Sequence, residues 1–294
     1  MRPNYITIFT PTYNRRNTID RLFKSLTNQS CFDFEWIVID DGSTDSTEKY
    51  FQNIKNQQLS FPITYIKKEN GGKHRAINEA VKIANGELFF IVDSDDYLTD
   101  NAVEYILNWR KSLDTTHKWA GLAGLRGSDS SNIIGQQPLG NTFVDAKNTE
   151  RRKYHLEGDK AEIYFTDILK RYPFPEVDGE NFISEEIVWN SIAHDGYYLR
   201  WFSSIIYICE YRDDGLTYNR LEIEKRNPQG LLLWSKNQIK VFSEDYREKV
   251  FAIFNYYQAV KGNKNLSQIA CDLAVSKLYL ICAILSFKIA KAIH

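Results

Sequence analysis

Cysteine is scarce in this chain of 294 residues, and its four copies lack the spacing of metal ligands. They are Cys31, Cys209, Cys271 and Cys282. This distribution argues against a zinc-finger type of site and predicts free thiols in a reducing compartment. The N-terminus shows no secretory signal, since Arg2-Pro3-Asn4 leads directly into a strand pattern. We therefore expect a cytoplasmic protein.

The apolar segment near the C-terminus is too short to cross a bilayer. Its longest uncharged run, Leu278 to Phe287, falls well short of the ~20 residues that a membrane-spanning helix needs. Lys277, Lys288 and Lys291 frame this run. Two interpretations remain open: a helix packed on the rest of the protein, or an interfacial helix that makes peripheral membrane contact.

A strong charge of one sign is absent, and so is a glycine-rich loop after the first predicted strand. The formal net charge is -1, so the composition gives no reason to expect a nucleic-acid partner. The segment Thr10 to Arg16 contains no glycine, which argues against a G-x-G-x-x-G dinucleotide site and against a sugar-nucleotide pyrophosphorylase. A phosphatase would need a nucleophile in that segment, and none is present.

The first part of the chain alternates regularly between strand and helix patterns. Four short β-branched or aromatic runs predict strands over Tyr5 to Phe9, Phe34 to Ile39, Ile63 to Ile66 and Leu88 to Val92. Helices are predicted between them, starting near Thr18, Ser43 and Ala76. This order predicts an α/β fold with a Rossmann-like, mostly parallel sheet that helices cover on both faces.

Polar or ionisable residues follow each of these strands. They are Tyr13, Asp41, Lys73 and the run Asp93-Ser94-Asp95-Asp96. Because ligands bind at the C-terminal ends of strands in open α/β sheets, we expect these side chains to converge on one rim. Three carboxylates within four residues repel one another and invite a divalent cation, and oxygen ligands favour Mg²⁺ or Mn²⁺. The alternative for Asp95 or Asp96 is a cap on the next helix.

Asp41 and Tyr13 suit an imide base, because a carboxylate accepts from the base N–H while an aromatic ring stacks on it. Each also has a structural alternative. Asp41 is placed to serve the N-terminus of a helix, and Tyr13 is an ordinary candidate for core packing.

These motifs resemble family 2 glycosyltransferases of the bacterial surface-polysaccharide type, which have the GT-A fold. The matching pieces stand in the family's order and spacing: Thr10-Pro11-Thr12-Tyr13-Asn14-Arg15, Asp40-Asp41-Gly42-Ser43-Thr44-Asp45, Asn70-Gly71-Gly72-Lys73-His74 and Asp93-Ser94-Asp95-Asp96. The resemblance continues, less tightly, through Gly158-Asp159-Lys160 and Phe182 to Asn190, and ends at Asp214 to Thr217. It covers roughly residues 3 to 220.

The resemblance implies a division of the chain and a set of donor-binding residues. Residues 1–105 would bind the nucleotide-sugar, residues 106–220 would bind the acceptor within the same GT-A domain, and residues 221–294 would form a C-terminal helical extension. The donor would be a UDP-sugar, with Mn²⁺ or Mg²⁺ as cofactor. The implied donor-binding residues are Pro11, Thr12, Tyr13, Arg15, Asp41, Lys73, His74, Asp93 and Ser94, and the implied metal ligands are Asp93, Asp95 and Asp96.

The resemblance also places an inverting transfer in this chain, with a carboxylate as general base. Glu185 matches the family's position for that base, and the adjacent Glu186 stays open as an alternative. Both could instead serve the N-terminus of the predicted helix that follows. Asp178, Asp213 and Asp214 are the reserve candidates.

The implied acceptor is a saccharide, lipid-linked, in polysaccharide biosynthesis at the cytoplasmic face of the inner membrane. The competing interpretation is a nucleotide-sugar or carbohydrate-binding protein with the GT-A fold that does not turn over its ligand.

Overall fold

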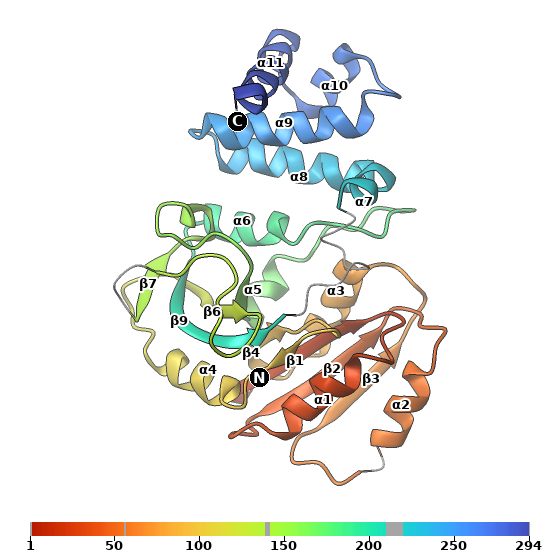
Figure 1. Ribbon diagram of the computed structural model, residues 1–294, viewed down its shortest axis with the longest axis vertical. Helices are drawn as coiled ribbons and strands as arrows, with labels where there is room; N and C mark the ends of the chain where they lie inside the picture. The colour runs from red at the N-terminus through yellow and green to blue at the C-terminus, as the bar shows by residue number, and fades with distance from the viewer. Residues whose placement is uncertain (1, 56, 139–141, 210–219, 294) are drawn as a thin grey trace.

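One sheet of nine strands forms the centre of the computed structural model, which describes residues 2–55, 57–138, 142–209 and 220–293 (Figure 1). The strand order is β3-β2-β1-β4-β8-β6-β9-β5, and β7 pairs with β9. The strands are β1 (Arg2–Thr12), β2 (Phe34–Asp40), β3 (Ile63–Lys67), β4 (Gly86–Ile91), β5 (Tyr97–Leu98), β6 (Trp119–Gly127), β7 (Phe143–Ala146), β8 (Lys160–Phe165) and β9 (Tyr198–Ile208).

The first four strands confirm the predicted parallel arrangement. β1 pairs in parallel with β2 and β4, and β2 pairs in parallel with β3. Beyond β4 the sheet is mixed, because β8 runs antiparallel to both of its neighbours while β6 and β9 are parallel to each other. The same sheet therefore passes through the segments predicted to bind the donor and the acceptor.

Helices cover both faces of the sheet, as the alternation of side chains along β1 and β2 requires. Ile6 and Ile8 belong to the apolar cluster beneath α1, α2 and α4, whereas Phe9 and Ile37 belong to the cluster that contains α3, α5 and α6. These helices are α1 (Ile19–Thr27), α2 (Thr47–Ile54), α3 (Lys73–Ile83), α4 (Ala102–Lys111), α5 (Thr166–Arg171) and α6 (Glu186–His194), and a short 3-10 helix spans Asn148–Glu150.

A stack of helices follows the sheet, which confirms the predicted C-terminal helical extension (Figure 1). Its members are α7 (Arg220–Arg226), α8 (Pro228–Val241), α9 (Tyr246–Val260), α10 (Leu266–Leu273) and α11 (Lys277–Ile293). The buried carboxylate of Glu180 accepts hydrogen bonds from the backbone N–H groups of Gln229 and Gly230 and so caps the start of α8. Asp245 caps α9 in the same way through its side chain.

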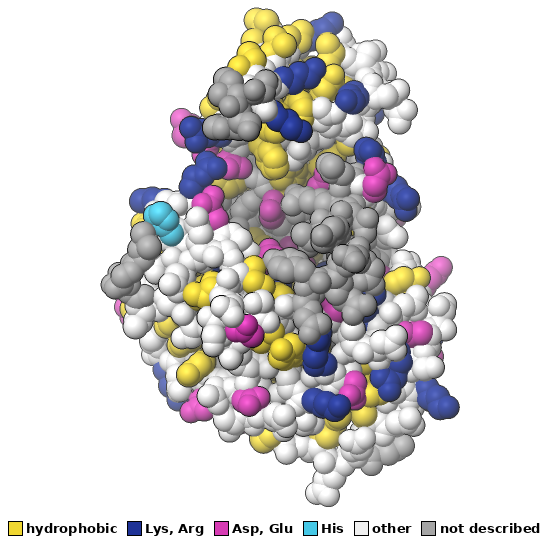
Figure 2. Space-filling view, in the orientation of Figure 1, with side chains coloured by type: hydrophobic (Ala, Val, Ile, Leu, Met, Phe, Trp, Pro, Cys, Tyr) yellow, Lys and Arg dark blue, Asp and Glu magenta, His cyan; other side chains and the backbone are white. Residues whose placement is uncertain are grey.

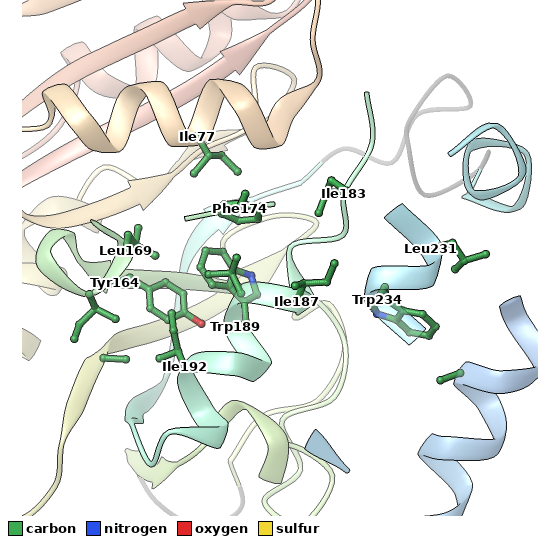
Figure 3. Packing of buried hydrophobic residues seen from close by; sticks show 14 of the residues in the cluster. Ile77, Tyr164, Leu169, Phe174, Ile183, Ile187, Trp189, Ile192, Leu231 and Trp234 are labelled. Carbon is green, nitrogen blue, oxygen red and sulfur yellow. The ribbon is translucent and has the colours of Figure 1, made fainter. Parts of the chain in front are cut away.

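Aromatic packing fixes α6 between the sheet and the helical stack (Figure 3). The ring of Trp189 stacks on Tyr164 of β8 with centroids 4.2 Å apart, and Phe174 meets the same indole edge-on at 5.6 Å. Ile187 of α6 belongs to the same buried cluster as Trp234 of α8. The start of α6, where Glu185 precedes the helix and Glu186 is its first residue, is therefore held from both sides.

Within the part of the chain that the structure describes, no single helix is long and apolar enough to cross a membrane. Together, α10 and α11 have the length and composition of a membrane-spanning segment, but the chain bends by 99° at the break between the two helices.

Candidate functional site

The predicted site residues gather at the C-terminal edge of the parallel strands. Tyr13 comes directly after β1, Asp41 after β2, and Asp93 just beyond β4, while Lys73 begins α3. Tyr13 is 48% exposed, so the alternative of core packing is wrong for this ring.

Lys73 is the charged centre of this edge. Its Nζ lies 2.6 Å from Oδ1 of Asp93 and 2.8 Å from Oε1 of Glu185. Burial alone would lower the pKa of the Lys73 ammonium, but the two carboxylates raise it above its usual value, so the group stays charged. One cation thus joins the end of β4 to the residue that precedes α6.

The three aspartates after β4 face different partners. Burial alone would raise the pKa of Asp93, but the charges of Lys73 and Arg126 lower it below its usual value. Oδ2 of Asp95 lies 3.5 Å from Nε of Arg15. Oδ2 of Asp96 accepts a hydrogen bond of 2.8 Å from the hydroxyl of Tyr207, and burial together with the charge of Asp93 raises the pKa of Asp96 to about 6.

The aspartates after β4 were predicted to bind a metal ion or, alternatively, to cap the next helix. Across residues 2–293, apart from the undescribed gaps, no group of three or more His, Cys, Asp or Glu side chains is arranged to hold a metal ion. The helix-cap alternative also finds no support, because Asn101 rather than Asp95 or Asp96 precedes the first residue of α4. Asp93 and Asp95 both have partly exposed side chains (28% and 22%), and Asp93 is paired with Lys73. The position of Asp95 suits a site in which phosphates and water supply the other ligands.

Asp41 is buried and surrounded by protein donors. Its carboxylate accepts from Nζ of Lys68 at 2.6 Å and from the backbone N–H groups of Gly71 and Gly72 at 2.9 and 2.8 Å. These contacts hold the turn that opens α3, so the structural alternative accounts for the position of Asp41. Its contact with a nucleotide base stays a prediction.

The turn before α3 also fits tightly against the chain that leads to Glu185. Gly72 has a φ of +96°, and a Cβ added there would stand 1.9 Å from the carbonyl oxygen of Asn181. The guanidinium of Arg75 donates to the carbonyls of Val177 and Glu180, each at 2.7 Å. We call these contacts, with the two bonds between Asn78 and the backbone of Phe174, the α3 clamp.

Glu185 and Glu186 differ in what they contact. Glu185 lies beside Lys73 and makes no capping hydrogen bond with its side chain. The carboxylate of Glu186 accepts from Nε1 of Trp234 at 2.6 Å and from Nε2 of Gln238 at 3.3 Å, both on α8. Of the reserve candidates, Asp178 lies in the segment held by the α3 clamp, and Asp213 and Asp214 lie outside the described residues.

A cavity of about 290 Å³ opens between the start of α3, the start of α6 and β8. Its lining combines charges of both signs with two aromatic side chains: Lys73, His74, Arg126, Arg151, Asp159, Lys160, Glu162, Asn181, Phe182, Ile183, Ser184, Glu185, Glu186 and Trp189. Such a mixture of ion-pairing groups, hydrogen-bonding groups and aromatic side chains suits a polar ligand such as a sugar.

His74 is neutral in this lining. It is 1% exposed, and neither ring nitrogen has a hydrogen-bond partner among the described residues. Burial and the charge of Arg75 lower the pKa of His74 to about 4. The imidazole can thus donate one hydrogen bond and accept another if water or ligand reaches it.

Two residues of the site were not singled out by sequence reasoning. The hydroxyl of Tyr207 accepts from the backbone N–H of Asp93 at 2.9 Å while it donates to Asp96, so it orients the aspartate run. Arg126 lies over the ring of Tyr207, 4.3 Å from its centroid. Both come from strands far along the chain, and no local pattern marks either of them.

Lys160 should give the fold a measurable pH dependence. Burial and the charge of Arg151 lower the pKa of this fully buried lysine to about 8, while its Nζ donates to the carbonyls of residues 157–159. Above that pH the unfolded chain binds more protons than the folded one, so the free energy of unfolding should rise until the unfolded lysine also titrates.

Urea unfolding of wild type and of Lys160→Met, each at about pH 7 and about pH 9.5, measures this effect. We expect the wild type to gain on the order of 2 kcal/mol relative to the variant across that interval. The exposed lysine variant Lys82→Met is the control and should follow the wild type. Equal pH dependence of the free energy of unfolding in all three proteins would contradict a lowered pKa of Lys160 in the folded chain.

Comparison with known proteins bears on what this site does. The family model described as glycosyl transferase family 2 matches residues 7–164, more than half of the chain. Poly(ribitol-phosphate) beta-glucosyltransferase of Bacillus spizizenii is 33% identical over 124 residues, which are 42% of this chain and 20% of that protein. The chain thus spans about a fifth of the length of this relative.

Solved structures share the fold. Residues 1–349 of Staphylococcus aureus TarS, in complex with UDP-GlcNAc, superpose with a TM-score of 0.61 at 19% identity, covering 96% of this chain and 88% of that one. The mannosyltransferase PcManGT from Pyrobaculum calidifontis, in complex with GDP-Man and Mn²⁺, superposes with a TM-score of 0.57 at 18% identity, covering 95% of this chain and 86% of that one. At these identities the likeness concerns the fold alone, and it confirms the GT-A-type α/β prediction.

Proposed function

Because the chain belongs to glycosyl transferase family 2, we propose that it transfers a sugar from a UDP-sugar to a hydroxyl group of a saccharide acceptor, with inversion. One observation carries the proposal. Lys73 forms ion pairs with both Asp93 and Glu185, and Lys73 and Glu185 line a cavity with room for a sugar. A phosphate-binding cation and a carboxylate base are the two groups that this reaction needs within reach of each other.

On the donor side, Asp95 is the residue that we propose holds the divalent metal. Its carboxylate is partly exposed at the strand edge, so the two phosphates and water could complete an octahedral set of oxygens. When bound, the metal supplies Lewis-acid stabilisation of the charge that builds on the departing diphosphate. Lys73 adds a second positive charge at the same place, and Tyr13 presents an exposed ring on which the base can stack.

On the acceptor side, Glu185 is the proposed general base. Glu185 lines the cavity, and its side chain makes no hydrogen bond that caps α6. Among the ion pairs of the described residues, only Lys73 balances its charge. A carboxylate in that position can take the proton of an acceptor hydroxyl while the sugar passes to the oxygen. Glu186 is a weaker candidate, because α8 already holds its carboxylate through Trp234.

We further propose a lipid-linked acceptor in the biosynthesis of a polysaccharide, with peripheral contact between the protein and a membrane. The names of the relatives support a polymeric acceptor, since the Bacillus spizizenii protein is named for poly(ribitol-phosphate). The TarS complex with UDP-GlcNAc supports a UDP-sugar, and the Mn²⁺ of the mannosyltransferase complex supports a divalent metal.

Slow release of UDP in the absence of acceptor tests the proposal most directly. The full chain would be incubated with UDP-glucose, UDP-galactose or either N-acetyl form, with Mn²⁺, with Mg²⁺ or with a chelator, and GDP-mannose would serve as the donor control. We expect metal-dependent release from at least one UDP-sugar and none from GDP-mannose. Tight binding of UDP without release from any donor, even with saccharide acceptors added, would favour the non-catalytic binding protein instead.

A further inference from the structure

The outward side of α11 carries an exposed apolar stripe. Leu278 is 72% exposed, Leu285 52% and Ile289 60%. With the exposed Cys282 they follow one another at intervals of four, three and four residues, which places them on one side of a helix. The opposite side is already packed, since Leu280, Ala283 and Ile284 are buried in the core cluster.

All the charge on α11 is positive. Lys277, Lys288 and Lys291 are exposed, and the helix contains no acidic residue between Lys277 and Ile293. By the helical spacing of about 100° per residue, Lys277 and Lys288 lie along one border of the apolar stripe, and Lys291 lies farther round, toward the packed side. Figure 2 shows hydrophobic and basic side chains side by side at the end of the molecule where Figure 1 places α11.

This charge pattern decides between two possible occupants of the stripe. A second copy of the chain, paired stripe to stripe, would bring lysines of one α11 near lysines of the other, and α11 offers no carboxylate to balance them. A surface of anionic lipid headgroups balances them directly. The helix is also too short to leave the interface and span the bilayer.

We propose that α11 docks in the plane of an anionic bilayer surface, with Leu278, Leu285 and Ile289 at the boundary between headgroups and acyl chains. Lys277 and Lys288, along the border of the stripe, then contact the anionic headgroups. The inference deepens the proposed function and rests on it, since a lipid-linked acceptor lies at that same surface. α11 is at the far end of the helical stack from the sheet, so docking does not cover the cavity (Figure 1).

Flotation of the full-length protein with two kinds of vesicle tests the docking. One kind is phosphatidylcholine alone, and the other contains about a third of phosphatidylglycerol. We expect binding to the anionic vesicles and little to the neutral ones. Leu285→Ser combined with Ile289→Ser should reduce binding at least about tenfold, and Lys277→Glu combined with Lys288→Glu should do so as well, since one lysine near the surface is worth about fivefold.

Matched variants and a parallel activity measurement make the outcome decisive. Ile133→Ser and Lys82→Glu change an exposed apolar and an exposed basic residue elsewhere and should bind as wild type. Release of UDP should be unchanged in every variant. Absence of release from the wild type would count against the proposed function but would not bear on the docking. Equal binding to neutral vesicles, or unaltered binding of the α11 variants, would overturn the docking. A dimer in light scattering that the Leu285 and Ile289 substitutions dissociate would assign the stripe to a second copy.

Discussion

Replacing Glu185 with glutamine is expected to lower acceptor-dependent sugar transfer by ~10²–10⁴-fold, the usual contribution of a general base. Glutamine has nearly the same shape, and its amide oxygen can still accept from Lys73, so the fold and the ion pair of Lys73 with Asp93 should survive. What is lost is the ability to take a proton. The turnover number with saturating donor and acceptor measures the loss, and calorimetric titration with UDP checks that nucleotide affinity stays close to that of the wild type.

Glu186→Gln is the matched control for this experiment. It makes the same chemical change one residue further along, where Trp234 can donate to an amide oxygen as well as to a carboxylate. We expect turnover within a few-fold of wild type. If Glu186→Gln is inactive while Glu185→Gln transfers normally, the base has been assigned to the wrong residue of the pair.

The second large effect is expected from Asp95→Asn. An asparagine keeps the size of the side chain but withdraws the negative charge that the metal requires, so donor cleavage should fall by ~10²–10³-fold, a few kcal/mol of transition-state stabilisation. The fold should be little affected, because the ion pair of Asp95 with Arg15 is partly exposed and is worth at most about 1 kcal/mol.

UDP release as a function of Mn²⁺ concentration is the measurement for this variant, with thermal unfolding recorded beside it. Asp100→Asn, the same substitution at an exposed position a few residues further on, should release UDP as the wild type does. Full activity of Asp95→Asn at saturating Mn²⁺ would show that this carboxylate does not hold the metal.

The sequence predicted the parallel part of the fold well because that part is built from local signals. Each of the first strands is a short apolar run, and each is followed by a helix whose apolar residues repeat at helical spacing. The mixed half of the sheet was not predicted. The order β4-β8-β6-β9 brings together strands that are distant in sequence, and such pairing depends on tertiary packing rather than on the local pattern.

The candidate site was predicted where a motif marks the end of a strand, and missed where a single residue reaches it from elsewhere. Asp93, Lys73 and Glu185 were found from their motifs, and the structure brings them together. Tyr207 and Arg126 lie on β9 and β6 and have no neighbours in sequence that signal a role. Asp41 shows another difficulty, since the turn that its carboxylate holds, before α3, is about thirty residues further along the chain and no local pattern marks that contact.

The α3 clamp has a practical consequence for exchanging parts between members of this family. Arg75 and Asn78 grip the backbone of the segment that ends at Glu185, and Gly72 leaves no room for a side chain against Asn181. A chimera joined after β4 would combine one parent's α3 with another parent's version of that segment, and the two surfaces would no longer match. A chimera should therefore acquire the acceptor preference of another family member only when α3 and the turn before it are exchanged together with that segment.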